Sequence, residues 1–344
     1  MFWTQLGAQF GIDGAVARAF RTLFPPTPGD TEVFAHGETA PGLLRNPAIP
    51  YEAGTVETAD GARIHVREYG PRSAPRIVLI HGYACRIEYW NPQINQLADR
   101  YRVTVYDQRG FGRSTQGNRP FSVDALGDDL SYVLGAVVPA GEQATIAGHS
   151  LGGIAIMSWA ARHPHDVARQ ARSVLLIDTI ADAFAASTKI LPAPGLDRPL
   201  RNRLLNFAIG RLPIPNPTVL GLLFRYTVLT TRAGHAETAF IEALIASCPN
   251  PFRTRAPSVL TDLDVTAGLP HLTIPTTIIV DTADRLTPPT ASRRIANLLR
   301  ANGITPYCLE LPGLGHCTTL EAPYTITAEI DRAATPGVVG RSVG

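Results

Sequence analysis

The sequence predicts an α/β fold, with a mostly parallel sheet of about eight strands, helices on both faces and an inserted helical cap. Two observations carry this prediction. From Gly54 onward, short apolar runs alternate with longer amphipathic runs, and several short runs are apolar on both faces, as strands buried between helical layers are. The alternation breaks between Asp182 and Pro270 and then resumes. We therefore expect one α/β core that an insertion interrupts.

Composition fits a globular protein of this size. The chain has 344 residues, of which 45% are hydrophobic and 17% charged. The net charge is +2, and the only lysine, Lys189, belongs to no basic run, which argues against nucleic-acid binding. The four cysteines show no Cys-x-x-Cys spacing, so we expect neither a metal site nor a redox pair.

Residues 1–53 differ in pattern from the rest of the chain and are expected to form an amino-terminal extension. Apolar residues recur there at roughly helical spacing, at Trp3, Leu6, Phe10, Ala17, Phe20 and Leu23. The segment has no basic start and no compact apolar stretch, so it is a poor secretory signal, and we expect a cytoplasmic protein. We expect the stripe to pack against the cap or the core, with peripheral membrane contact as the alternative.

The first part of the core is expected at 54–181. Asp60-Gly61 favours a tight turn between strands at 55–58 and 63–69. The other expected strands are 77–81, 102–106, 143–149, 173–178, 276–281 and 305–311.

Helices are expected in the intervals between strands, at 88–98, 123–138 with Ser122 as the N-cap, 152–162, 290–302 and 320–333. The interval 182–270 is rich in proline early and apolar later, which indicates the helical cap. Residues 271–344 then complete the core.

The stretch AGHSLGG, residues 147–153, places a serine between glycines where a strand ends and a helix begins. Gly148 and Gly152 let the strand and the helix approach closely, and the tight turn lifts the hydroxyl of Ser150 off the strand. This spacing is typical of a nucleophile elbow, in which a Gly-x-Ser-x-Gly turn lies between a strand and a helix. The helix also directs its first amides toward that hydroxyl.

A serine hydroxyl needs a base and an acid that orients the base. His316, in a glycine-bearing loop after the last expected strand, is the best candidate base. Asp284, directly after the preceding strand, is the best candidate acid. Asp178 and Asp281 also follow or end strands and remain alternatives.

An acyl-transfer intermediate needs donors for its oxyanion. The backbone amides of Leu151 and Tyr83 are the candidates, since Leu151 follows the serine and Tyr83 lies in the loop after the strand that ends at His81. His81 and His149 are expected to brace loops by hydrogen bonds.

Two further pairs of residues near these motifs have structural interpretations. Asp107 and Arg109 are expected to fix the loop after the fourth strand. Cys85 and Cys317 lack the elbow geometry and are expected to pack as small residues.

Five ordered blocks now give a resemblance: 79–82 (LIHG), 106–114 (YDQRGFGRS), 148–153 (GHSLGG), 284–289 (DRLTPP) and 315–323 (GHCTTLEAP). The chain resembles the α/β-hydrolase fold superfamily, in the branch whose cap lies between the sixth and seventh strands. The order Ser150, Asp284, His316 is the order expected of its triad.

This resemblance implies a serine hydrolase that cleaves a small-molecule carboxylic ester through an acyl-enzyme, without a metal or organic cofactor. Caps in this superfamily commonly shape the substrate pocket, so apolar cap residues are candidate contacts for a lipophilic acyl group, namely Leu204, Phe207, Leu223 and Phe224. A serine nucleophile argues against the dehalogenases and epoxide hydrolases of the fold. Alternatives are a carbon–carbon bond hydrolase, an acyltransferase, a perhydrolase or a ligand-binding receptor.

Overall fold

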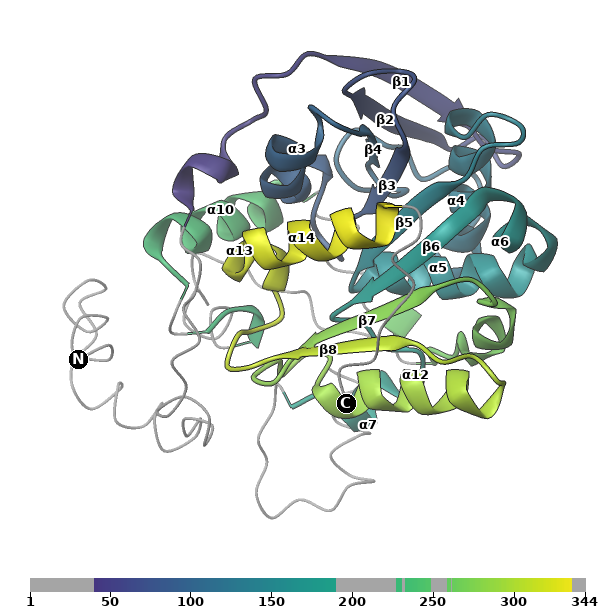
Figure 1. Ribbon diagram of the computed structural model, residues 1–344, viewed down its shortest axis with the longest axis vertical. Coiled ribbons are helices and arrows are strands. Elements are labelled where there is room, and N and C mark those ends of the chain that lie inside the picture. The colour runs from purple at the N-terminus through teal and green to yellow at the C-terminus, as the bar shows by residue number, and fades with distance from the viewer. Residues whose placement is uncertain (1–39, 190–226, 231–232, 249–258, 261, 336–344) are drawn as a thin grey trace.

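The computed structural model describes residues 40–189, 227–230, 233–248, 259–260 and 262–335 (Figure 1). Eight strands form one sheet in the order β1-β2-β4-β3-β5-β6-β7-β8. The β1–β2 and β2–β4 pairs are antiparallel, and every other pair is parallel. The strands are β1 (Tyr51–Glu57), β2 (Arg63–Tyr69), β3 (Arg76–Ile80), β4 (Arg102–Tyr106), β5 (Ala144–His149), β6 (Ala171–Ile177), β7 (Thr276–Asp281) and β8 (Tyr307–Leu311). The predicted fold class is confirmed.

Helices cover both faces of the sheet. On one face α3 (Asn91–Leu97) packs against α14 (Pro323–Ala334), and on the other α4 (Val123–Val137) packs against α5 (Leu151–Arg162) (Figure 1). The remaining core helices are α6 (Pro164–Gln170), α12 (Pro289–Ala301) and the short α13 (Thr318–Glu321). As expected, Ser122 caps α4, because its side chain accepts a hydrogen bond from the amide of Ala125.

Three elements differ most clearly from their predicted bounds, and most of the others differ by one or two residues. β1 begins at Tyr51 rather than at residue 55, and its mostly exposed residues explain why no burial pattern marked its start. The expected helix at 88–98 is a 3-10 helix, η2 (Ile87–Trp90), followed by α3, and Pro92 lies in the first turn of α3. The expected helix at 320–333 is likewise divided into α13 and α14 before Pro323, because proline is tolerated only in the first turn of a helix.

The described part of the expected cap contains α7 (Phe184–Ser187), α10 (His235–Ala246) and η4 (Thr266–His271). Helix α10 contacts η1 (Pro41–Leu44) and η2, whereas η4 packs on α5 of the core. The four cap residues predicted to contact substrate and the apolar stripe at residues 3–23 lie outside the described residues. Among those described, no helix is both long and apolar enough to cross a membrane.

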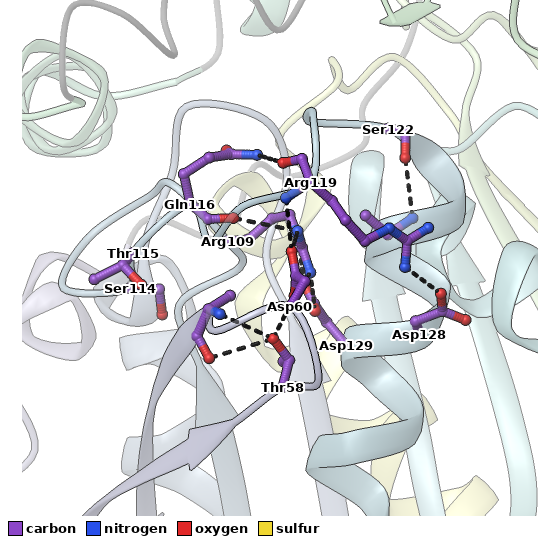
Figure 2. A network of polar contacts seen from close by, with 12 residues as sticks. Thr58, Asp60, Arg109, Ser114, Thr115, Gln116, Arg119, Ser122, Asp128 and Asp129 are labelled. Carbon is purple, nitrogen blue, oxygen red and sulfur yellow. Dashed lines mark hydrogen bonds and ion pairs between the residues drawn. The ribbon is translucent and has the colours of Figure 1, made fainter.

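A buried arginine network fixes the loop after β4 (Figure 2). Nε of Arg109 donates to Asp129 over 2.6 Å, and its Nη1 donates to Asp60 over 3.0 Å. Asp60 also accepts the amide of Arg119, whose guanidinium pairs with Asp128. A cavity of about 920 Å³ adjoins these residues, and its carboxylates and guanidinium groups are paired with one another. The structural role expected for Arg109 is confirmed.

Candidate active site

Ser150 lies on a strained turn between β5 and α5. Its φ of 53° and ψ of −114° are sparsely populated for a residue with a side chain. A Cβ atom at Gly148 would lie 2.4 Å from the carbonyl carbon of Gly152, and one at Gly152 would lie 2.3 Å from the carbonyl oxygen of Ile80. Glycine is therefore required at both positions for the turn to form.

The structure brings Ser150, His316 and Asp284 together. Nε2 of His316 lies 3.0 Å from Oγ of Ser150, and Nδ1 of His316 lies 2.9 Å from Oδ2 of Asp284. Ser150 is 9% exposed and Asp284 is 2% exposed. This hydrogen-bonded chain has the geometry by which a base can take the serine proton and an acid can orient the base.

Asp284 is held by its own loop. Its Oδ1 accepts the amides of Leu286 and Thr287 over 2.7 and 3.0 Å, and its Oδ2 accepts the Thr287 hydroxyl over 2.7 Å. Burial by itself raises the pKa of this carboxyl, but the charge of His316 and these hydrogen bonds outweigh it and lower the pKa below the usual value. Asp284 is therefore ionised at neutral pH.

Thr287, which no sequence motif indicated, also places its hydroxyl 3.1 Å from Nδ1 of His316. The available signal was a threonine three residues after an aspartate in a loop, which is typical of side chains that bond to nearby backbone amides.

The two alternative acids have other partners. Asp178, directly after β6, and Asp281, at the end of β7, are both fully buried, and each contacts the hydroxyl of Thr318. Neither forms a hydrogen bond with His316, whereas Asp284 does.

His149 braces the loop that carries His316, as expected. Its Nε2 lies 2.7 Å from the carbonyl oxygen of His316. Because a carbonyl only accepts, Nε2 of His149 carries the proton. Burial lowers the pKa of His149 to about 3, so the ring stays neutral, and it stacks on Tyr89 with the centroids 4.8 Å apart.

Residues 227–230 of the expected cap region also contact the loop that carries His316. Glu321 accepts the amide of Gly315 over 2.6 Å, and it also accepts the amide and hydroxyl of Thr230. The amide of Cys317 donates to the carbonyl of Val228 over 3.1 Å. The loop of His316 is thus tied to residues 227–230.

The loop after β3 lies against the serine. A Cβ atom at Gly82 would lie 3.3 Å from Cβ of Ser150, so the backbone of this loop approaches Ser150 closely. His81 fixes the loop, because its Nε2 accepts the amide of Gln108 and its Nδ1 donates to the carbonyl of Gly82. Tyr83 comes next in the chain.

On the other side of the serine, Leu151 is the first residue of α5, at the positive end of the helix dipole.

Other reactive groups nearby are not activated. Burial raises the pKa of the Cys85 and Cys317 thiols, which keeps both protonated at neutral pH. In the part of the chain that the structure describes, no group of three or more His, Cys, Asp or Glu side chains is placed to hold a metal ion.

Known proteins resemble this chain in sequence and in fold. Residues 77–330 match the alpha/beta hydrolase family. A putative carbamate hydrolase RutD of Caulobacter sp. (strain K31) is 29% identical over 81% of this chain and 96% of its own length. A bifunctional esterase/perhydrolase DCH of Acinetobacter calcoaceticus is 32% identical, over 44% of this chain and 54% of that protein.

Solved structures also resemble this chain in fold. The solved structure of an esterase from Exiguobacterium antarcticum has a TM-score of 0.68 at 18% identity and covers 82% of this chain and 99% of that one. The family match covers most of the chain, and its range includes the serine elbow, the acid loop and the histidine loop. The chain therefore belongs to the alpha/beta hydrolase family.

Proposed function

We propose that this protein cleaves a carboxylic ester through an acyl-enzyme formed on Ser150. One observation carries the proposal, namely the continuous hydrogen-bonded chain from Oγ of Ser150 through His316 to Asp284. Supporting it, the serine occupies a strained turn at a helix N-terminus, and relatives of the chain bear the names of an esterase and a carbamate hydrolase.

In the first half-reaction, Oγ of Ser150 bonds to the ester carbonyl carbon while Nε2 of His316 takes the hydroxyl proton. The carbonyl oxygen becomes an oxyanion, for which the amides of Leu151 and Tyr83 are the proposed donors. The bond to the alcohol then breaks, and His316 returns its proton to the departing alkoxide. Asp284 stays ionised throughout and orients the imidazole.

In the second half-reaction, a water molecule gives a proton to His316 and its oxygen bonds to the acyl carbon. The acid leaves, and Ser150 regains its proton from His316. All proton transfers use Nε2, which faces the serine over 3.0 Å. These steps need no metal ion or organic cofactor.

The apolar composition of the expected cap region supports a lipophilic acyl group. Leu229 is buried, and its Cα would lie 3.1 Å from a Cβ atom at Gly315, next to the base. Val228 is also buried. A series of p-nitrophenyl esters from acetate to octanoate should show kcat/KM rising with chain length. A wide advantage for acetate would contradict this specificity.

The direct test of the proposed function compares p-nitrophenyl ester turnover by the wild type, Ser150→Ala and Ser131→Ala. Ser131 lies on α4, outside the site, and its variant is the matched control. We expect loss of turnover in Ser150→Ala only. Turnover that survived Ser150→Ala would refute the mechanism, and slow wild-type acylation with tight ligand binding would favour a receptor.

A second candidate function is suggested by the relative named as a bifunctional esterase/perhydrolase. The same acyl-enzyme could pass its acyl group to hydrogen peroxide, which would form a peracid and free Ser150. Adding peroxide at fixed ester concentration tests this, because peracid would then appear in place of part of the acid. Cleavage of a diketone, or transfer to an added alcohol, would indicate the carbon–carbon hydrolase or acyltransferase alternative.

A further inference from the structure

Two buried carboxyls lie behind the loop that carries His316 and take no part in the mechanism above. Asp178 and Asp281 stand at the carboxyl ends of the neighbouring parallel strands β6 and β7, and both are fully buried. Oδ1 of Asp178 accepts the amide of Asp281 over 3.2 Å. Thr318, two residues after His316, reaches both carboxyls with one hydroxyl.

The single hydrogen of the Thr318 hydroxyl indicates the protonation state of the two carboxyls. Its Oγ1 lies at hydrogen-bond distance from Oδ2 of Asp178 and 2.5 Å from Oδ2 of Asp281. A hydroxyl has one hydrogen and can donate to only one of these oxygens. The other short contact is favourable only if that carboxyl is protonated and donates to Oγ1.

We propose that Asp178 and Asp281 share one proton, and that Thr318 uses this neutralised pair to hold the His316 loop against the ends of β6 and β7. This inference rests on the proposed function in one respect, since it assigns these three residues the task of positioning the base. None of them contacts the reacting atoms.

The surroundings of the pair favour a bound proton. Burial raises the pKa of both carboxyls, and the charges of Asp281 and Asp284 add to the rise at Asp178. At Asp281, Glu321 and Asp284 also raise the pKa, while the bond from Thr318 lowers it.

The other titratable groups that interact with Asp178 are the thiol of Cys317 and the phenol of Tyr89, both buried. Of the residues that the structure describes, no lysine or arginine forms an ion pair with either carboxyl. The shared proton is thus what offsets the charge of the pair.

Loss of this proton at alkaline pH would leave two buried carboxylates facing one hydroxyl. The hydroxyl of Thr318 could donate to only one of them, and the loop of His316 would lose one of its attachments. We therefore expect kcat to fall at alkaline pH when the pair loses its proton. The cause would be displacement of His316, because neither carboxyl takes part in the reaction itself.

Two substitutions at Thr318 test the positioning role. Thr318→Val removes the hydroxyl at nearly constant shape and should lower kcat roughly 10- to 100-fold with KM little changed, since small displacements of catalytic groups cost this much. Thr318→Ser restores the hydroxyl and should recover most of the activity. Equal activity of the valine and serine variants would overturn the role.

Two neutral substitutions test the proton. Asn at either position cannot lose a proton in this range, so Asp178→Asn and Asp281→Asn should each move the alkaline limb of the kcat profile to higher pH. Limbs identical to that of the wild type in both variants would overturn the proposed link between the pair and the base.

Infrared spectroscopy gives a readout that needs neither turnover nor Thr318 variants. In the Ser150→Ala protein, the carbonyl stretch of a protonated carboxyl should be present at neutral pH and disappear at alkaline pH. It should be absent at neutral pH when Asp178→Asn or Asp281→Asn is added. No such band, or a band that survives in both double variants, would overturn the shared proton, whatever the fate of the ester mechanism.

Discussion

The substitution Asp284→Asn tests the proposed role of Asp284 as the acid, because the hydrogen bonds around its carboxyl fix how an asparagine must lie there. The amides of Leu286 and Thr287 both point at Oδ1, so the amide oxygen of an asparagine must take that place. Its NH₂ group then takes the place of Oδ2 and donates to Nδ1 of His316. The imidazole proton moves to Nε2, where it faces Ser150 and blocks proton transfer.

The size of the expected loss of activity follows from the free energy of the other orientation of the asparagine amide. Turning the asparagine over would restore the correct tautomer but leave two buried N–H groups facing an NH₂ group, at about 1–3 kcal/mol each. A total of about 2–6 kcal/mol corresponds to a loss of roughly 30- to 20,000-fold in the competent population. We expect kcat/KM for a p-nitrophenyl ester to fall within this range.

The matched control is Asp99→Asn, an exposed aspartate outside the site, which should retain wild-type kcat/KM. Circular dichroism would verify that both variants are folded. If Asp284→Asn kept more than a third of the activity while Asp178→Asn or Asp281→Asn lost it, the assignment of the acid would be refuted.

The geometry supports three further predictions. Gly152→Ala should destabilise the fold by about 1–3 kcal/mol in thermal unfolding, because its Cβ would lie 2.3 Å from the carbonyl of Ile80. Gly135→Ala on α4, where nothing lies within 4 Å, should instead stabilise by up to about 1 kcal/mol, and the reverse order would contradict the close approach. Replacing the Leu151 amide with an ester by incorporating the hydroxy acid should lower kcat about 10²- to 10³-fold, and unchanged kcat would remove it from the oxyanion site. Finally, folding raises the pKa of Asp178, so the native protein keeps this proton at pH values above the unfolded pKa of about 3.9. The unfolded chain loses the proton there, so the free energy of unfolding should fall by about 1.4 kcal/mol per pH unit until the native pKa is reached. Urea titrations over pH should show that slope reduced in Asp178→Asn, and equal slopes in the two proteins would count against the raised pKa.

Much of the fold was predictable because buried strands carry a strong local signal. β4 and β7 lie at their predicted positions, since each is a fully buried run rich in β-branched residues. β1 was placed four residues late because an exposed edge strand need not alternate between apolar and polar residues. Helices divided at Pro92 and Pro323 were predicted as continuous, although proline marks a first turn.

The site was predictable only as far as the motifs reached. Ser150 and His316 lie in patterns with distinctive spacing, whereas three aspartates follow or end strands and look alike in sequence. Their difference arises from tertiary contacts, because the loop after Asp284 folds its amides onto one carboxyl oxygen. The contacts of Thr318 join ends of two strands that are distant in sequence, so no local pattern could indicate them.

The measurement that tests the central claim most directly is the site and rate of covalent trapping by a p-nitrophenyl phosphonate. We predict a burst of about one p-nitrophenolate per chain, an adduct that peptide mass mapping places on Ser150, and trapping slowed by about 10³-fold or more in His316→Ala. An adduct on any other residue, or trapping of His316→Ala at the wild-type rate, would contradict a serine nucleophile that His316 activates.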